Sequence, residues 1–184
     1  MTSTTTDQNP SLLRWLARRW PTLAAIPLVA VTLYGLDDVR GLAFLLVLCP
    51  LAYLVPASFS RPGITWPAVL IGAVAVGPLR IFELNVAYAL LVASVVFVVL
   101  GTVRRAPGFG LQVVAAVLFA AVAVIAIEAG SLVFGGVLIS LGLLAHAAWD
   151  AYHHRVNRVV PRSYAEWCFV VDVILGVAAI VLIV

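Results

Sequence analysis

Long apolar stretches follow one another along almost the whole chain, and this feature constrains the fold most strongly. Seven of them are separated only by short polar or Pro/Gly segments, and they cover residues 20–36, 41–59, 64–79, 85–103, 111–129, 131–153 and 164–184. With a mean hydropathy of +1.15, the chain has more apolar surface than a water-soluble core can bury. The sequence therefore predicts an all-α protein, a polytopic transmembrane helix bundle of about seven spans.

The stretch at 64–79 is the least regular of the seven. Trp66-Pro67 lies near its start, Gly72 and Gly77 lie within it, and Pro78 lies near its end. Because proline removes a helical hydrogen bond, a kinked or short helix is expected there. The sequence leaves open whether this helix crosses the membrane completely.

Arginine placement predicts the orientation of the bundle. The 11 basic residues are all arginines, and most of them lie in segments on the same side as the N-terminus. That side holds Arg14, Arg18, Arg19, Arg61, Arg104, Arg105, Arg155, Arg158 and Arg162, and the other side holds Arg40 and Arg80. The positive-inside rule then places the N-terminus in the cytoplasm and the C-terminus outside. A chain rich in alanine and valine and without lysine is typical of a high-GC bacterial genome, so a multi-pass protein of a bacterial cell membrane is expected.

Three segments are expected along the chain. Residues 1–10 are polar and lack an apolar period, which predicts a disordered tail. Residues 11–19 place leucines and arginines on different sides, which predicts a short interfacial helix, with a charged flank of the first span as the alternative. Residues 20–184 form a single transmembrane helical domain.

Basic residues are scattered singly between the spans, so nucleic-acid binding is not expected. Cys49 and Cys168 lie in different spans and imply no disulfide framework.

The chemically richest part of the sequence lies near its end. All three histidines, His146, His153 and His154, fall within a short segment that also contains Asp150. At 100° per residue, these four side chains share about 100° of a helical face. They are expected to form a polar stripe on the cytoplasmic half of the sixth span.

Depth in the membrane predicts the partners of this stripe. If the chain reverses near residue 159, residues at equal distances from that point lie at equal height. The predicted pairs are His146 with Asp172, Asp150 with Cys168, and His154 with Tyr164. Asp172 would lie about 12 Å inside its span, where an unpaired carboxylate is costly. His146 is therefore its predicted partner.

The polar site admits three functional hypotheses. In the first, the buried pair fixes the register of the last two helices in a structural or partner-binding membrane protein. In the second, His146, Asp150 and His153 bind a divalent metal such as zinc in an enzyme that acts on a lipid within the membrane. His154 is the alternative to His153 in that site, and Asp172 or Cys168 is a further ligand. In the third, the same residues relay protons for a small-molecule carrier, although spans one, four and five supply few polar residues for a continuous path.

No further motif assigns an activity. The sequence contains no G-x-S-x-G elbow, phosphate loop or dinucleotide fingerprint, so the catalytic residues are unknown and an enzyme is not favoured. The loop at 154–163 is basic, and Arg155, Arg158 and Arg162 are expected to bind anionic lipid headgroups at the cytoplasmic face. No feature of the sequence identifies a protein partner.

Seven spans with a His and Asp cluster facing the cytoplasm resemble the architecture of the integral-membrane hydrolases of the alkaline ceramidase and adiponectin receptor superfamily. The resemblance implies a zinc-dependent lipid amidohydrolase as one expectation. It does not extend to motifs, because that superfamily has an H-x3-H on its last span. Here the stretch at 164–184 contains no histidine, and the spacing is His146-x3-Asp150. No site residue is therefore carried over, and membership is not inferred.

Overall fold

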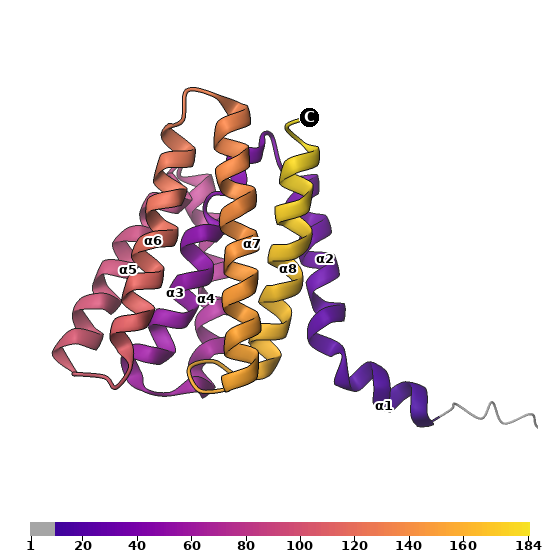
Figure 1. Ribbon diagram of the computed structural model, residues 1–184, viewed down its shortest axis with the longest axis vertical. Coiled ribbons are helices and arrows are strands. Elements are labelled where there is room, and N and C mark those ends of the chain that lie inside the picture. Colours follow the sequence, from indigo (N-terminus) through magenta and orange to yellow (C-terminus); the bar gives the residue numbers. More distant parts are fainter. Residues whose placement is uncertain (1–9) are drawn as a thin grey trace, which may run out of the picture.

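The computed structural model describes residues 10–184, and all regular secondary structure in this part of the chain is helical (Figure 1). Its elements are α1 (Pro10–Arg18), α2 (Trp20–Tyr34), η1 (Val39–Leu42), α3 (Leu45–Phe59), η2 (Pro62–Ile64), α4 (Thr65–Ile81), α5 (Val86–Val103), α6 (Phe109–Glu128), α7 (Leu132–Val156) and α8 (Arg162–Val181). The predicted all-α fold is confirmed. Of the predicted tail at residues 1–10, all but Pro10 lies outside the described residues.

Within residues 10–184, six helical segments are long and apolar enough to cross a membrane. They are α3 with η1 before it, α4 with η2 before it, and α5, α6, α7 and α8. The remaining candidate, α2, has 15 residues and is shorter than the stretch at 20–36, because the helix ends at Tyr34 and the chain turns from Gly35 onwards. Six long apolar helices and one shorter helix agree with the prediction of about seven spans.

A short helix, α1, precedes the bundle and extends away from it at an angle to α2 (Figure 1). It lies at the same end as the loops α3–α4, α5–α6 and α7–α8. These loops and the helix ends beside them carry six arginines: Arg61, Arg104, Arg105, Arg155, Arg158 and Arg162. We call this end of the bundle the arginine-rich end. A helix is thus present where the interfacial helix was expected, and its location in a membrane interface stays a prediction.

The centre of the bundle is α3, which packs against α4, α5, α6 and α7. Most of its residues are buried, whereas α4 buries only Thr65 and Val69. Although a kinked or short helix was expected there, α4 is continuous over 17 residues, with Pro78 close to its end. Near a helix end the missing N–H of proline affects few further hydrogen bonds. α4 therefore lies at the periphery and α3 provides the core.

Two helical hairpins bring the polar residues together. α6 and α7 are joined by residues 129–131, and α7 and α8 by residues 157–161, with Asn157 in the left-handed conformation (φ 49°) at the end of α7. The members of each hairpin pack against one another. Gly135 of α7 lies so close to α6 that an added Cβ would be 2.8 Å from the carbonyl oxygen of Ala126. The absence of a side chain at Gly135 therefore allows α6 and α7 to approach closely.

Candidate functional site

The polar site is built around His146 of α7 and Asp172 of α8. The Nδ1 atom of His146 lies 2.7 Å from Oδ2 of Asp172, and both side chains are fully buried. The two helices are joined by a short loop, so residues equidistant from it lie at equal height. The predicted pairing is confirmed. With Nδ1 donating to the carboxylate, Nε2 of His146 carries the ring's remaining lone pair, and no described residue hydrogen-bonds to it.

Asp150 belongs to the same buried group, one helical turn from His146. Its Oδ2 atom lies 3.4 Å from Nδ1 of His146, and its Oδ1 atom accepts a hydrogen bond of 2.5 Å from the hydroxyl of Tyr53 on α3. The equal height of Asp150 and Cys168 stays a prediction, but the hydrogen bond to Asp150 does not come from Cys168. A residue of the central helix stabilises this carboxylate instead.

Two cysteines complete the site. Sγ of Cys49 lies 3.8 Å from Oδ1 of Asp172, and Sγ of Cys168 lies 3.8 Å from Oδ2 of the same carboxylate. The hydroxyl of Tyr164 donates to Sγ of Cys168 at 3.5 Å. Cys49, His146, Cys168 and Asp172 each offer one donor atom, and these four atoms all lie within 4.8 Å of one another. We call these four residues the Cys/His/Asp cluster.

The two remaining histidines lie outside this cluster. Nδ1 of His153 lies 3.0 Å from the carbonyl oxygen of Trp149, and its Nε2 lies 3.1 Å from the amide nitrogen of Gln112 on α6. Because a carbonyl only accepts, Nδ1 carries the proton and Nε2 accepts from Gln112. Both nitrogens of His153 are therefore engaged. His154 is partly exposed and lines a different cavity beside Arg19 and Glu166.

The structure thus changes the expected ligand set. The sequence favoured His146, Asp150 and His153, with Asp172 or Cys168 from the last span, whereas the clustered donors are Cys49, His146, Cys168 and Asp172. Asp150 lies beside the cluster, bonded to Tyr53. The sequence reasoning missed Cys49, Tyr53 and Gln112. Cys49 and Tyr53 are four residues apart on α3, and this spacing on one helical face was a signal that could have found them.

The basic residues assigned to headgroup binding are exposed at the arginine-rich end. Arg162 donates from Nε to the carbonyl oxygen of His154 at 3.1 Å and so covers the end of α7. Arg158 lines a cavity of about 410 Å³ together with Arg61 and Gly108. Arg155 is exposed in the last turn of α7. Binding of anionic headgroups by these arginines stays a prediction.

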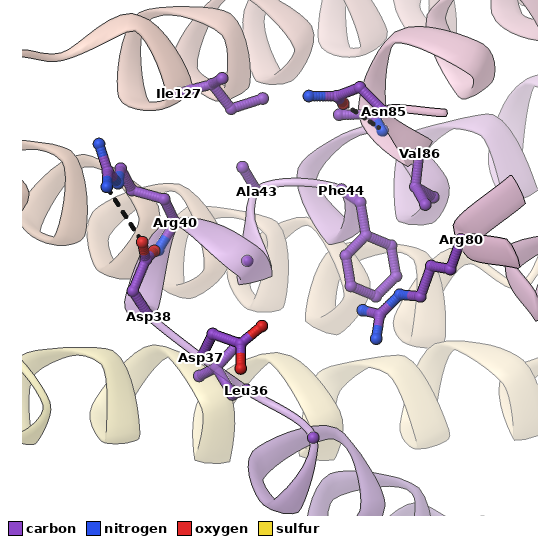
Figure 2. A pocket seen from close by; sticks show the side chains of 13 residues that line it. Leu36, Asp37, Asp38, Arg40, Ala43, Phe44, Arg80, Asn85, Val86 and Ile127 are labelled. Atoms are coloured by element: carbon purple, nitrogen blue, oxygen red, sulfur yellow. Dashed lines mark hydrogen bonds and ion pairs between the residues drawn. The ribbon is translucent and has the colours of Figure 1, made fainter. Parts of the chain in front are cut away.

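A third cavity, of about 490 Å³, opens at the opposite end of the bundle (Figure 2). It is lined by charged and polar side chains of η1, α4 and α5 and the turns before them, among them Asp37, Asp38, Arg40, Arg80 and Asn85. Arg40 and Asp38 form an ion pair of 3.0 Å, and the guanidinium of Arg80 lies over the ring of Phe44, 5.9 Å from its centroid. Both signs of charge are present, so the lining favours no simple anion or cation.

The Asp38–Arg40 pair yields a small pH dependence of stability. The hydrogen bond from the Arg40 side chain holds the pKa of Asp38 below its usual value. The pair therefore stabilises the fold fully at a pH above the unfolded-state pKa of Asp38. This contribution is lost as the pH falls through the lower pKa that Asp38 has in the folded state. The pair is partly exposed, so the loss should stay below about 1 kcal/mol. Asp38→Asn keeps the oxygen that accepts from the Arg40 amide and should remove this component of an acid unfolding curve. Asp37→Asn is the matched control, and an equal effect of both changes would contradict the assignment.

Comparison with protein-family models, with curated proteins and with solved structures gives no match. The function must therefore follow from the chemistry of the side chains themselves.

Proposed function

We propose that this is a metal-binding membrane protein in which the Cys/His/Asp cluster holds a divalent ion such as zinc. The observation that supports this proposal is the convergence of four buried donor atoms from α3, α7 and α8 within 4.8 Å. Two thiolates, an imidazole and a carboxylate form a donor set that suits zinc, and thiolates disfavour the harder ions magnesium and calcium. The ion would tie together helices that are far apart in the sequence.

The distances in the cluster are close to those of a tetrahedral site. Ligand bonds of 2.0 to 2.3 Å place neighbouring donor atoms about 3.3 to 3.8 Å apart. Here the two sulfurs lie 3.8 Å from the carboxylate oxygens, and Nδ1 of His146 lies 2.7 Å from Asp172. The ion would replace the proton between His146 and Asp172 and would push these two donors slightly apart. Small side-chain movements are sufficient for binding.

The ion would also solve an electrostatic problem. Carboxylates and thiolates are costly in the interior of a membrane bundle unless an opposite charge accompanies them. No described arginine forms an ion pair with Asp150 or Asp172, and the one basic side chain that contacts both carboxylates among the described residues is that of His146. A divalent cation compensates this charge.

Four protein ligands leave no open coordination position, which is typical of a structural zinc site. The geometry therefore favours a structural or partner-binding role over a metal-dependent enzyme that acts on a lipid. A proton-coupled carrier is supported less, because Ile139, Leu143 and Leu175 are buried apolar residues on the far side of the site from the arginine-rich end. By the positive-inside rule, we infer that the arginine-rich end faces the cytoplasm of a bacterial cell.

The test is the metal content of purified protein supplied with zinc. We expect about one ion per chain in the wild type, the stoichiometry of a single tetrahedral site, and a nearly complete loss in Cys49→Ala and Cys168→Ala. His154→Ala, which lies outside the cluster, should keep the ion. Cobalt in place of zinc should give intense thiolate-to-metal absorption bands that weaken when either cysteine is removed.

Two results would overturn the proposal. One is negligible metal in the wild type after zinc loading, with an intact chromatographic profile. The other is metal that persists in both cysteine variants, which would place the ion elsewhere in the chain.

A further inference from the structure

The cavity at the end opposite the arginine-rich end carries charges that the proposed metal function does not use. Its volume of about 490 Å³ lies within the range of about 300 to 1,000 Å³ that is usual for ligand pockets. Asp38 and Arg40 in its wall neutralise one another through their ion pair. The charged groups that remain among the described lining residues are the carboxylate of Asp37 and the guanidinium of Arg80.

Asp37 and Arg80 point towards one another across this cavity without forming a pair. Figure 2 shows the carboxylate and the guanidinium entering the cavity from opposite sides. Among the described residues, neither charged group has a hydrogen-bond or ion-pair partner. The guanidinium of Arg80 stacks on the ring of Phe44, and this contact stabilises it on its own side of the cavity. A ligand between the two groups therefore meets a negative charge at one end and a positive charge at the other.

The ends of two helices add partial charges of the same signs on the same sides. The C-terminus of α2 reaches the cavity at Gly35, two residues before Asp37. The N-terminus of α5 reaches it at Asn85 and Val86, and Figure 2 shows Arg80 on this side. A helix carries a partial negative charge at its C-terminus and a partial positive charge at its N-terminus. The cavity is therefore negative on the α2 side and positive on the α5 side.

Asn85 adds a hydrogen-bond donor on the positive side. Its Oδ1 atom accepts from the backbone amides of Ala87 and Tyr88 at 3.0 and 3.3 Å, which caps α5. Its side-chain NH2 group has no partner among the described residues and is the part of the amide that is left for a ligand. Guanidinium and amide N–H groups bind the oxygens of phosphates and carboxylates. The positive side therefore fits an oxyanion, and the carboxylate of Asp37 fits an ammonium group.

Exposed apolar side chains beside the cavity indicate where such a ligand comes from. Tyr34, Ile81 and Phe82 are sequence neighbours of lining residues, and their exposed fractions are 95%, 79% and 74%. Large apolar and aromatic side chains that stay exposed at helix ends are typical of the boundary between the hydrocarbon and the headgroups of a membrane. A molecule at this boundary that combines an ammonium group with an oxyanion is a phospholipid with a zwitterionic headgroup.

We propose that this cavity binds the headgroup of phosphatidylethanolamine from the leaflet at the end opposite the arginine-rich end. The phosphate accepts hydrogen bonds from Arg80 and Asn85, and the primary ammonium group donates to Asp37. Phosphatidylcholine offers the same phosphate, but its quaternary nitrogen has no N–H to donate. This site does not depend on the proposed metal function, because none of its lining residues is a member of the Cys/His/Asp cluster.

The experiment is a lipid titration of the full chain in detergent, followed by native mass spectrometry. Phosphatidylethanolamine and phosphatidylcholine with identical acyl chains are added separately, and the dissociation constant of the first bound lipid is measured for each. We expect phosphatidylethanolamine to bind about tenfold more tightly, because its ammonium group alone donates hydrogen bonds to a carboxylate. Tenfold corresponds to about 1.4 kcal/mol of binding free energy.

Two variants test the two ends of the headgroup separately. Asp37→Asn removes the charge that the ammonium group meets and should abolish most of the tenfold preference. Arg80→Gln should weaken the binding of both lipids several-fold, because both carry the phosphate. Glu83→Gln is the matched control, because it removes an exposed carboxylate from the turn after α4 that does not line the cavity, and it should keep the preference. Zinc content should be the same in all three variants, which separates this test from that of the metal site.

Three results would overturn the proposal. The first is equal affinity of the unchanged chain for the two lipids. The second is a preference that survives Asp37→Asn, or that Glu83→Gln lowers as much as Asp37→Asn does. The third is complete displacement of the bound lipid by an equimolar amount of glycerophosphoethanolamine, which would assign the cavity to a soluble zwitterion instead of a membrane lipid.

Discussion

His146→Ala is expected to lower the free energy of unfolding by about 3 to 5 kcal/mol, the cost of removing one partner from a buried pair. The reason is that Asp172 is fully buried and receives its 2.7 Å hydrogen bond from His146. After truncation, the hydrogen-bond donors that remain at this carboxylate among the described residues are the weakly donating thiols of Cys49 and Cys168 at 3.8 Å. Neither thiol replaces a charged or strongly polar partner.

The measurement is reversible unfolding in mixed micelles with a chelator present, so that metal binding does not contribute to the difference. His154→Ala is the control, because His154 is partly exposed and outside the cluster, and it should change stability by less than about 0.5 kcal/mol. The double change His146→Leu with Asp172→Leu removes both polar groups and should recover most of the loss. A His146→Ala effect as small as that of His154→Ala would show that the pair contributes little.

The success and failure of the sequence predictions around this pair have a common physical cause. His146 and Asp172 lie on helices joined by a short loop, so their equal height follows from chain geometry alone. Asp150 has the same geometric relation to Cys168, yet its partner is Tyr53 of α3. No short loop links α3 to α7. Their relative height is set by packing of the whole bundle, which a single sequence does not contain.

Cys49 shows the same limit for the metal ligands. Its position in an apolar stretch indicated a buried thiol, and its spacing from Tyr53 places both residues on one helical face, but neither observation identifies Asp172 as the neighbour of Cys49. Once α3 occupies the centre of the bundle, the side chains of Cys49 and Tyr53 on one of its faces meet α7 and α8. The class of fold was accessible because apolar length alone decides it. The ligand set was not, because it depends on three helices at once.

The boundaries of α2 illustrate a smaller discrepancy. The apolar stretch at 20–36 included Gly35 and Leu36, but the helix ends at Tyr34 and the following residues form the turn to η1. Hydropathy does not distinguish an apolar turn residue from a helical one. The ends of a helix are therefore predicted less accurately from sequence than the presence of the helix.

The second large effect is expected from Gly135→Ala in the α6–α7 hairpin. The added Cβ would lie 2.8 Å from the carbonyl oxygen of Ala126, closer than van der Waals contact allows. A flexible side chain could turn away, but this oxygen belongs to the backbone of α6 and moves only with the helix. Overpacking of this kind costs about 1 to 3 kcal/mol, which exceeds the 0.5 to 1 kcal/mol that alanine gains over glycine within a helix.

Gly77→Ala provides the matched control for this change. Gly77 lies within α4, and its added Cβ would have no neighbour within 4 Å among the described residues. Only the helix-forming gain of alanine then remains, and Gly77→Ala should raise the free energy of unfolding by up to about 1 kcal/mol. The two variants should therefore shift stability in opposite directions in the same unfolding assay. If both variants raised the free energy of unfolding, the close approach of α6 and α7 at Gly135 would be contradicted.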